Sequence, residues 1–241
     1  HCRLGINIDH IATLRNARGE NHPNLLRAAK VVKKCKVDSI TMHLREDRRH
    51  IVDEDLFLLK KNVKIPINLE IAPTFEMINI ALALKPHSIC FVPENREELT
   101  TEGGLDVKKN FSIINELISF LKNSKIKIAC FIDSEKKQID CLKKLNVKCL
   151  EINTGKYALE NNVIKKRKII DKIKNSIKYA NNLGMSCHAG HGLNFKNVGL
   201  IASLTEIEEL NIGQFLIGES IFNGLENSIL EMKKIIKESR L

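Results

Sequence analysis

Residues 43–50 read His-Leu-Arg-Glu-Asp-Arg-Arg-His and gather two histidines, three arginines and two acids in one short stretch. The stretch begins where an apolar, strand-like run over 39–43 ends. Imidazole groups titrate near neutral pH and guanidinium groups hold anions, so this combination at a strand end indicates proton transfer beside a bound anion. A salt-bridged surface loop would have the same composition, and the other strand ends must decide between the two interpretations.

Two further positions suggest the same kind of chemistry. Glu70 lies inside the apolar run 66–71, where an unpaired carboxylate that faced outward among helices would cost roughly several kcal/mol. If it points into a shared mouth instead, it is a general acid/base candidate whose pKa burial can tune. His191 lies between Gly190 and Gly192, which indicates either a tight turn or an acid next to a backbone N–H group that faces an anion.

Short β-branched runs alternate with longer amphipathic runs along the whole chain. The predicted strands are 4–9, 39–43, 66–71, 88–92, 127–132, 149–153, 185–189 and 209–213. The predicted helices are 24–35, 53–61, 75–84, 108–122, 135–145, 163–183, 197–204 and 221–238. This alternation in 241 residues is typical of an α/β fold with parallel strands, a (β/α)8 or TIM barrel. An open doubly wound sheet is the alternative, but residues 7–12 lack the Gly-rich phosphate motif that usually follows its first strand.

Active sites of such barrels lie at the carboxyl ends of the strands, because the loops there line one mouth. The polar residues at the predicted ends are Asn7, Asp9, His10, His43, Arg45, Glu70, Glu94, Asp133, Glu151, Asn153, His191 and Gly213. Their convergence favours a site over a solvated surface. We expect the loops after the last two strands to cradle a phosphate, and the long loop 92–105 to act as a lid.

Composition indicates an ordinary globular protein, and we expect one domain over 1–241. The net charge of +10 invites a nucleic-acid interpretation, but the lysines are scattered along helical stretches and aromatics make up only 5%. Solvated helix faces, with modest steering of phosphorylated substrates, explain the charge better. No run approaches the roughly 20 apolar residues of a membrane span and the first residues have no signal-peptide layout, so we expect a cytoplasmic protein.

Metal binding is not expected. The seven cysteines are an odd number without C-x-x-C spacing, which favours buried free thiols over a zinc site or a disulfide framework. His43, His50, Glu70 and His191 match no recognised ligand spacing, and the neighbouring arginines would repel a cation.

Six blocks of the chain carry a resemblance to a known family. They are Asn-Ile-Asp-His-Ile-Ala-Thr-Leu-Arg-Asn-Ala-Arg-Gly at 7–19, the stretch 43–50, Asn-Leu-Glu at 68–70, Thr-Thr-Glu-Gly-Gly-Leu-Asp at 100–106, Ala-Gly-His-Gly-Leu at 189–193 and Glu-Leu-Asn-Ile-Gly at 209–213. In order and in residue type they closely resemble the pyridoxine 5'-phosphate synthases, which catalyse the last step of the deoxyxylulose-dependent vitamin B6 route. The blocks span nearly the whole chain.

The resemblance implies a ring-closing transferase that condenses 3-amino-2-oxopropyl phosphate with 1-deoxy-D-xylulose 5-phosphate through an imine, giving pyridoxine 5'-phosphate, phosphate and water. It implies that His43 and Glu70 accept protons, His191 donates one and Glu151 stabilises charge. Asp9, His10, Arg45, His50 and Thr100 would contact the deoxyxylulose phosphate, and Asn7, Arg18, Gly192, Gly213 and Gln214 the aminoketone phosphate. It further implies a cofactor-free homo-oligomer, a homooctamer in the family.

One position departs from the family pattern: Gln214 stands where the family often has His, so phosphate binding by its backbone is a safer expectation than proton transfer. Two other functions would account for some of these site residues. A phosphosugar isomerase or lyase would need the acid, the base and one phosphate cradle, but not a second phosphate site at Arg18 and His50. A non-catalytic carrier of a vitamin B6 phosphate would have no use for Glu70 and the strand-end histidines.

Overall fold

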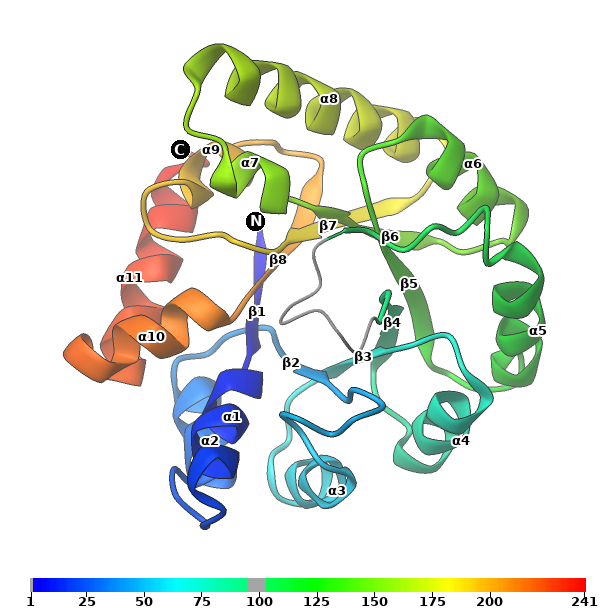
Figure 1. Ribbon diagram of the computed structural model, residues 1–241. Coiled ribbons are helices and arrows are strands. Elements are labelled where there is room, and N and C mark those ends of the chain that lie inside the picture. Colours follow the sequence, from blue (N-terminus) through cyan, green and yellow to red (C-terminus); the bar gives the residue numbers. More distant parts are fainter. Residues whose placement is uncertain (1, 95–102) are drawn as a thin grey trace.

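The computed structural model describes residues 2–94 and 103–241, and in these residues eight parallel strands close into a barrel (Figure 1). The strands are β1 (Arg3–Asn7), β2 (Ser39–His43), β3 (Ile67–Ile71), β4 (Ser88–Phe91), β5 (Lys127–Ile132), β6 (Cys149–Asn153), β7 (Ser186–Gly190) and β8 (Ile207–Ile212). Each strand pairs with its neighbours in chain order, and β8 pairs with β1 to close the ring. The predicted (β/α)8 barrel is confirmed, and the open sheet is excluded.

Helices surround the strands and cover their outer faces (Figure 1). Those between or after the strands are α2 (Leu25–Lys34), α3 (Asp53–Asn62), α4 (Phe75–Leu84), α5 (Phe111–Leu121), α6 (Lys136–Lys144), α8 (Val163–Asn182), α9 (Val198–Ala202) and α11 (Leu225–Glu238). Their apolar stripes face the barrel: α2, for example, buries Leu25, Ala29 and Val32, and the Asn24 side chain caps its first turn.

Three further helices, α1 (Asp9–Arg18), α7 (Gly155–Leu159) and α10 (Gln214–Asn223), were not predicted. Each follows a strand within one or two residues, so no run of turn residues marks its start. The predicted strand 4–9 ends at Asn7, and Asp9 instead opens α1. The predicted helix 221–238 corresponds to α11 and includes only the end of α10, because Gly224 separates the two helices with a φ of +76°.

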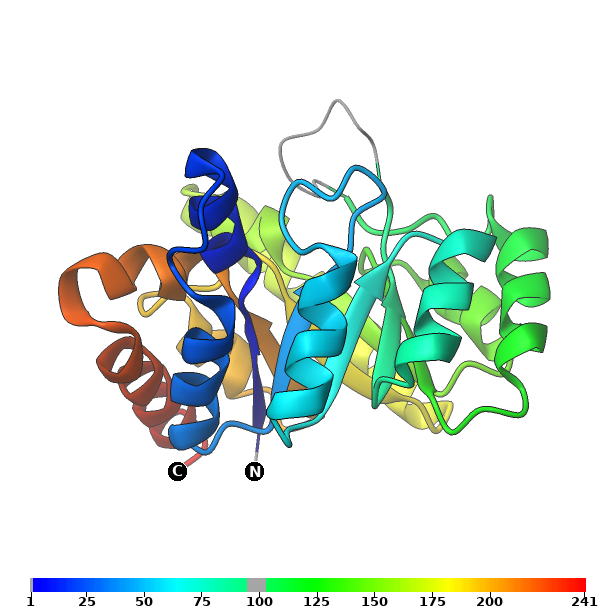
Figure 2. The same ribbon diagram turned by 90° about the horizontal axis from the view of Figure 1, so that it is seen from below.

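The two ends of the barrel differ. In the side view, α1 and the loop after β2 lie at the end to which the strands point, and both chain termini lie at the opposite end (Figure 2). Helices α7 and α10 also begin directly after their strands, so they start at the same rim as α1. In the described residues, no helix has both the length and the apolar character needed to cross a membrane. The seven cysteines are free thiols; five of them are buried as expected, and Cys141 and Cys149 are partly exposed.

The inside of the barrel is unusually polar. Thr41, Asn68, Glu151 and Asn211 are all buried there, and their side chains bond to one another or to neighbours. The Asn211 amide accepts a hydrogen bond from Thr41 Oγ1 (3.0 Å) and donates one to Glu151 Oε2 (2.7 Å). These bonds satisfy the buried polar groups and hold the Glu151 carboxyl in a defined position.

A glycine makes room for this network. A Cβ atom on Gly5 would lie 2.2 Å from Asn211 Oδ1 and 2.6 Å from Ser39 Oγ, both well inside van der Waals contact. Position 5 therefore needs glycine for lack of space, although its φ is not left-handed.

We predict that Gly5→Ala lowers the free energy of unfolding by about 1–3 kcal/mol, the usual cost of overpacking a core. For a chain of this length that corresponds to a melting temperature lower by about 2–4 °C per kcal/mol. Thermal and urea denaturation measure the effect. Gly218→Ala is the matched control, because Gly218 lies in α10 with open space around its Cβ position and should not lose stability. Equal stability of the two variants would contradict the steric argument.

Candidate active site

A cavity of about 490 Å³ opens at the carboxyl ends of the strands. Its lining includes every residue to which the resemblance gives a role, except Arg18 and Thr100, but not the strand-end residues Glu94, Asp133 and Asn153. Arg18 ends α1 with its side chain 78% exposed and 3.7 Å from Glu20, away from the cavity lining. Thr100 lies outside the described residues, as does most of the predicted lid 92–105.

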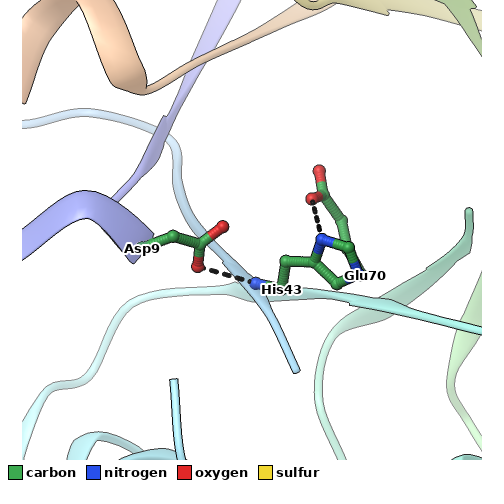
Figure 3. A group of neighbouring side chains, drawn as sticks. All are labelled: Asp9, His43 and Glu70. Atoms are coloured by element: carbon green, nitrogen blue, oxygen red, sulfur yellow. Dashed lines mark hydrogen bonds and ion pairs between the residues drawn. The ribbon is translucent and has the colours of Figure 1, made fainter. Parts of the chain in front are cut away.

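Three of the lining side chains meet at the ends of β1, β2 and β3 (Figure 3). His43 and Glu70 occupy paired positions of β2 and β3, and His43 Nδ1 lies 4.0 Å from Glu70 Oε2. Asp9 Oδ1 accepts a hydrogen bond from the backbone N–H of His43 (2.8 Å), and Asp9 Oδ2 accepts one from Asn7 Nδ2 (2.8 Å). Strand register therefore places an imidazole beside a carboxyl, and α1 supplies a second acid that fixes the backbone at His43.

Burial raises the pKa values of the carboxyl groups in this cavity. The pKa of Glu70 is raised well above its ordinary value, first by burial and then by the nearby charges of Glu151 and Asp9. Burial also raises the pKa of Glu151 to about 8, although the hydrogen bond from Asn211 opposes the shift. The pKa of Asp9 is raised by burial too, against the opposing effect of His43. With a pKa of about 8, the Glu151 carboxyl keeps its proton near neutral pH and can act as an acid there.

Burial lowers the pKa values of three histidines around the same cavity. His50 has its pKa lowered to about 4, by burial and then by the charges of His10 and His43. His10 and His191 have lowered pKa values as well, chiefly through burial. These rings are neutral at pH 7 and can accept protons or hydrogen bonds.

His10 carries one further sign of a ligand site. Its ring nitrogen Nδ1 is buried and has no hydrogen-bond partner among residues 2–94 and 103–241. Buried polar atoms in native proteins are nearly always paired, so an unpaired nitrogen in a cavity wall indicates a place for a ligand atom. The His50 ring lies 5.5 Å away and is held through Nδ1 by Thr13 Oγ1 at 2.7 Å.

The turn after β7 has a strained backbone. His191 has a φ of +83° and Gly192 a φ of +75°, so two consecutive residues are left-handed. The Thr154 hydroxyl lies 2.7 Å and 2.6 Å from the carbonyl oxygens of Gly190 and His191 and holds the turn in place. Gly155 leaves space for the His191 ring, since a Cβ there would lie 2.6 Å from His191 Cδ2. Strain of this kind in a non-glycine residue is typical of functional sites.

Groups that can bind anions lie at two places on the same rim, at the start of α10 and after β2. Gly213 and Gln214 line the cavity at the start of α10, whose first turn carries no side-chain cap from the described residues. Uncapped N–H groups at a helix start, together with the helix dipole, attract phosphate. A Cβ at position 213 would lie 2.6 Å from Asn7 Cβ, so glycine permits this close approach. On the other side of β1, Arg45 is buried (3% exposed) and faces the cavity beside His10 and His50.

The sequence allowed two interpretations of the charged stretch 43–50, a site or a salt-bridged loop, and each is correct for part of it. His43, Arg45 and His50 line the cavity. Arg48 instead forms ion pairs with Asp53 (2.8 Å) and Glu76 (2.6 Å), and Arg49 pairs with Asp47 (2.6 Å). Part of the stretch is therefore a site, and part is the salt-bridged loop that supports it.

Asp9, His43 and Glu70 also have ligand atoms within 4.8 Å of one another, close enough to consider a metal ion. Metal ligands must give up their protons, but burial favours the protonated forms of both acids here. Both oxygens of Asp9 already accept hydrogen bonds, and the guanidinium of Arg45 lines the same cavity. The donor set suits proton transfer better than a cation.

Two residues matter more than the sequence indicated. Asn211, within the block 209–213, is a cavity residue that holds Glu151. From the sequence, Glu94 was counted among the strand-end residues but was assigned no role. In the structure its carboxylate oxygen Oε1 lies 3.0 Å from His43 Nε2. The position of Glu94, three residues after the end of β4, was a visible signal, but only the folded barrel shows that its carboxylate reaches the ring of His43.

The closed barrel and the titratable cavity at its strand ends define the class: an enzyme of the (β/α)8 type. The model of the family "Pyridoxal phosphate biosynthesis protein PdxJ" matches residues 4–238. The chain belongs to this family and is an enzyme of vitamin B6 biosynthesis.

The curated relatives are similar to this chain over nearly their whole length. The pyridoxine 5'-phosphate synthase of Blochmanniella floridana is 47% identical, covering 98% of this chain and 96% of the relative. That of Zymomonas mobilis is 48% identical over 99% and 93% of the two chains, and that of Wolbachia from Culex pipiens is 49% identical over 98% and 100%.

Solved structures support the fold alone. The chain resembles KGPDC from Streptococcus mutans with a TM-score of 0.66 at 12% identity, covering 100% of this chain and 99% of the other. It resembles thiamine phosphate pyrophosphorylase from Pyrococcus furiosus with a TM-score of 0.64 at 10% identity, covering 99% and 97%.

The raised pKa of Glu151 makes stability depend on pH. Between the ordinary glutamate value and a pKa of about 8, the folded protein binds a proton that the unfolded chain does not, so stability falls as pH rises through this range. We predict that Glu151→Gln removes this loss, so that its stability relative to the parent rises from pH 5 to pH 8, by on the order of 1 kcal/mol per pH unit at most.

Urea denaturation at several pH values measures the difference. Glu116→Gln, on the exposed side of α5, is the control and should track the parent. Parallel stability curves for the parent and Glu151→Gln would show that the carboxyl is ionised in the folded protein.

Proposed function

We propose that this enzyme condenses 3-amino-2-oxopropyl phosphate with 1-deoxy-D-xylulose 5-phosphate to form pyridoxine 5'-phosphate, releasing phosphate and water. Membership of the family and the names of its relatives support this reaction. The main observation in support of this reaction is the composition of the cavity. Its lining combines carboxyl groups with raised pKa values and imidazoles with lowered ones, and it has anion-binding groups at the start of α10 and after β2. A condensation of two phosphorylated substrates needs both features.

The anion-binding groups divide between the two substrates. Asp9, His10, Arg45, His50 and Thr100 would contact the deoxyxylulose phosphate. Asn7, Arg18, Gly192, Gly213 and Gln214 would hold the aminoketone phosphate. The first assignment is supported by Arg45 and by His10 Nδ1, which has no hydrogen-bond partner in the described part of the chain, and the second by the start of α10. Arg18 and Thr100 rest on the resemblance alone.

Four residues would move or stabilise charge: His43 and Glu70 as proton acceptors, His191 as a donor, and Glu151 as a group that stabilises charge along the path. Imine formation, loss of water, loss of phosphate and ring closure require several proton transfers but no redox step. Burial raises the pKa of Glu70, which makes its carboxylate a stronger base for the acceptor role. His191 is neutral at pH 7 and would acquire its proton during the cycle before passing it to a leaving group.

A homo-oligomer in the cytoplasm completes the proposal. Apolar side chains remain widely exposed at the rim helices, with Leu159 of α7 81% exposed and Phe222 of α10 84% exposed. Exposed apolar groups of this size are common at contacts between protein chains. An assembly of barrels, a homooctamer in the family, would cover such groups.

Incubation of the purified protein with both substrates tests the reaction. We expect pyridoxine 5'-phosphate and inorganic phosphate in equal amounts, detected by chromatography and a phosphate assay. The buffer contains a chelator, so product formed there needs no divalent ion. Omission of either substrate is the control, and phosphate release or isomerisation with one substrate alone would favour a lyase or isomerase instead.

We predict that Glu70→Gln lowers turnover by roughly 10²- to 10⁴-fold, the usual contribution of one positioned acid/base group. The amide keeps the size of the side chain but cannot exchange the proton, so the fold and substrate affinity should persist. Steady-state kinetics and isothermal titration measure the two effects, with Glu116→Gln as the control. Near-normal turnover would remove Glu70 from the mechanism.

A further inference from the structure

Glu94 follows β4 and its side chain is only 4% exposed. Its two carboxylate oxygens have different partners: Oε1 lies 3.0 Å from Nε2 of His43, and Oε2 accepts a hydrogen bond from the backbone N–H of Glu46 (3.0 Å). The carboxylate therefore bridges the ring at the end of β2 and the loop that continues from it.

These contacts determine which nitrogen of His43 carries the proton. A carboxylate can only accept hydrogen bonds, so the Nε2 that faces Glu94 must be the N–H donor in the neutral ring. The other nitrogen, Nδ1, then has a free lone pair, and it points toward Glu70 in the cavity (Figure 3). Burial alone would raise the pKa of Glu94, but the hydrogen bonds from His43 and Glu46 hold that pKa below its ordinary value. Glu94 is thus ionised.

We propose that Glu94 is the positioning residue of the active site: it holds His43 in the Nε2–H form and so makes Nδ1 the proton acceptor. This inference rests on the proposed function for the acceptor role of His43. In that step the lone pair of Nδ1 forms a new N–H bond, and the substrate keeps the electron pair of the bond that it loses. The resulting imidazolium lies against the Glu94 carboxylate, which stabilises it in the way that an acid supports histidine in catalytic triads.

The same carboxylate has a second effect that must be separated from the first. By accepting the N–H of Glu46, it anchors the loop that carries Arg45 and His50. Loss of this anchor would disturb substrate binding and raise KM. Loss of the Nε2–H tautomer would lower kcat, because Nδ1 of His43 would carry the proton and could no longer accept one from the substrate.

Glu94→Gln separates the two effects. The side-chain oxygen of glutamine can still accept the N–H of Glu46, which turns its NH2 group toward His43 Nε2. The ring must then accept at Nε2 and carry its proton on Nδ1. We expect kcat to fall by on the order of 10⁴-fold, the effect of the same change in a catalytic triad, with KM changed less than about threefold.

Nitrogen-15 NMR of His43 reports the tautomer directly in the resting protein. The parent should show Nε2–H, and Glu94→Gln should show Nδ1–H. Glu76→Gln is the matched control: it makes the same chemical change at an exposed carboxylate that pairs with Arg48 of the same loop, and it should alter neither kcat nor the tautomer.

A parent ring that carries its proton on Nδ1 overturns the inference, whether or not any variant folds. A Glu94→Gln enzyme with raised KM, unchanged kcat and an Nε2–H ring also overturns it, because Glu94 would then only anchor the loop. The NMR measurement needs no substrate. If the parent makes no pyridoxine 5'-phosphate but shows Nε2–H, the proposed function fails while the orientation of His43 by Glu94 stands.

Discussion

The hydrogen bonds between β8 and β1 close the barrel, and the arrangement of the cavity depends on them. In a closed ring of parallel strands, the register of each pair determines which side chains share a level inside. Pairing of His43 with Glu70, and of Asn153 with Gly190, follows from those registers. An open sheet with the same strands would place the first and last of them at opposite edges, and the residues after β1 and β8 could not face one ligand.

Closure also explains the unusual protonation of the site. Asp9 and Glu151 are buried in the cavity, and the Glu70 side chain is only 16% exposed, although the three residues come from α1, β6 and β3. Burial raises the pKa of all three carboxyl groups, and the charges of Glu151 and Asp9 raise that of Glu70 further. Burial in the cavity consequently favours the protonated, uncharged form of each of these acids. Acids that hold protons and imidazoles that lack them give the site both kinds of proton-transfer group at one pH.

Sequence reasoning reached the fold because strand and helix periodicity is strong and regular in this chain. Strands β2, β5 and β6 have the predicted bounds, since each is a β-branched or apolar run with clear ends. It missed α1, α7 and α10 because these helices begin almost directly after a strand. Most site residues were predictable from their position at a strand end, but the contacts between side chains on different strands of the barrel were not. That Asn211 bonds to Glu151, or that Glu94 reaches His43, depends on the distance between strands far apart in sequence.

The left-handed backbone at His191 lowers the stability of the fold, while the imidazole at this position serves the proposed function. A β-carbon in that conformation costs about 1–3 kcal/mol relative to a residue without one, and glycine would relieve the cost at once. A laboratory selection for heat resistance alone would therefore enrich glycine at this position and discard the imidazole. Engineering of thermostable variants should leave residue 191 out of the randomised set, and seek its gains at the exposed helix faces, where no such conflict exists.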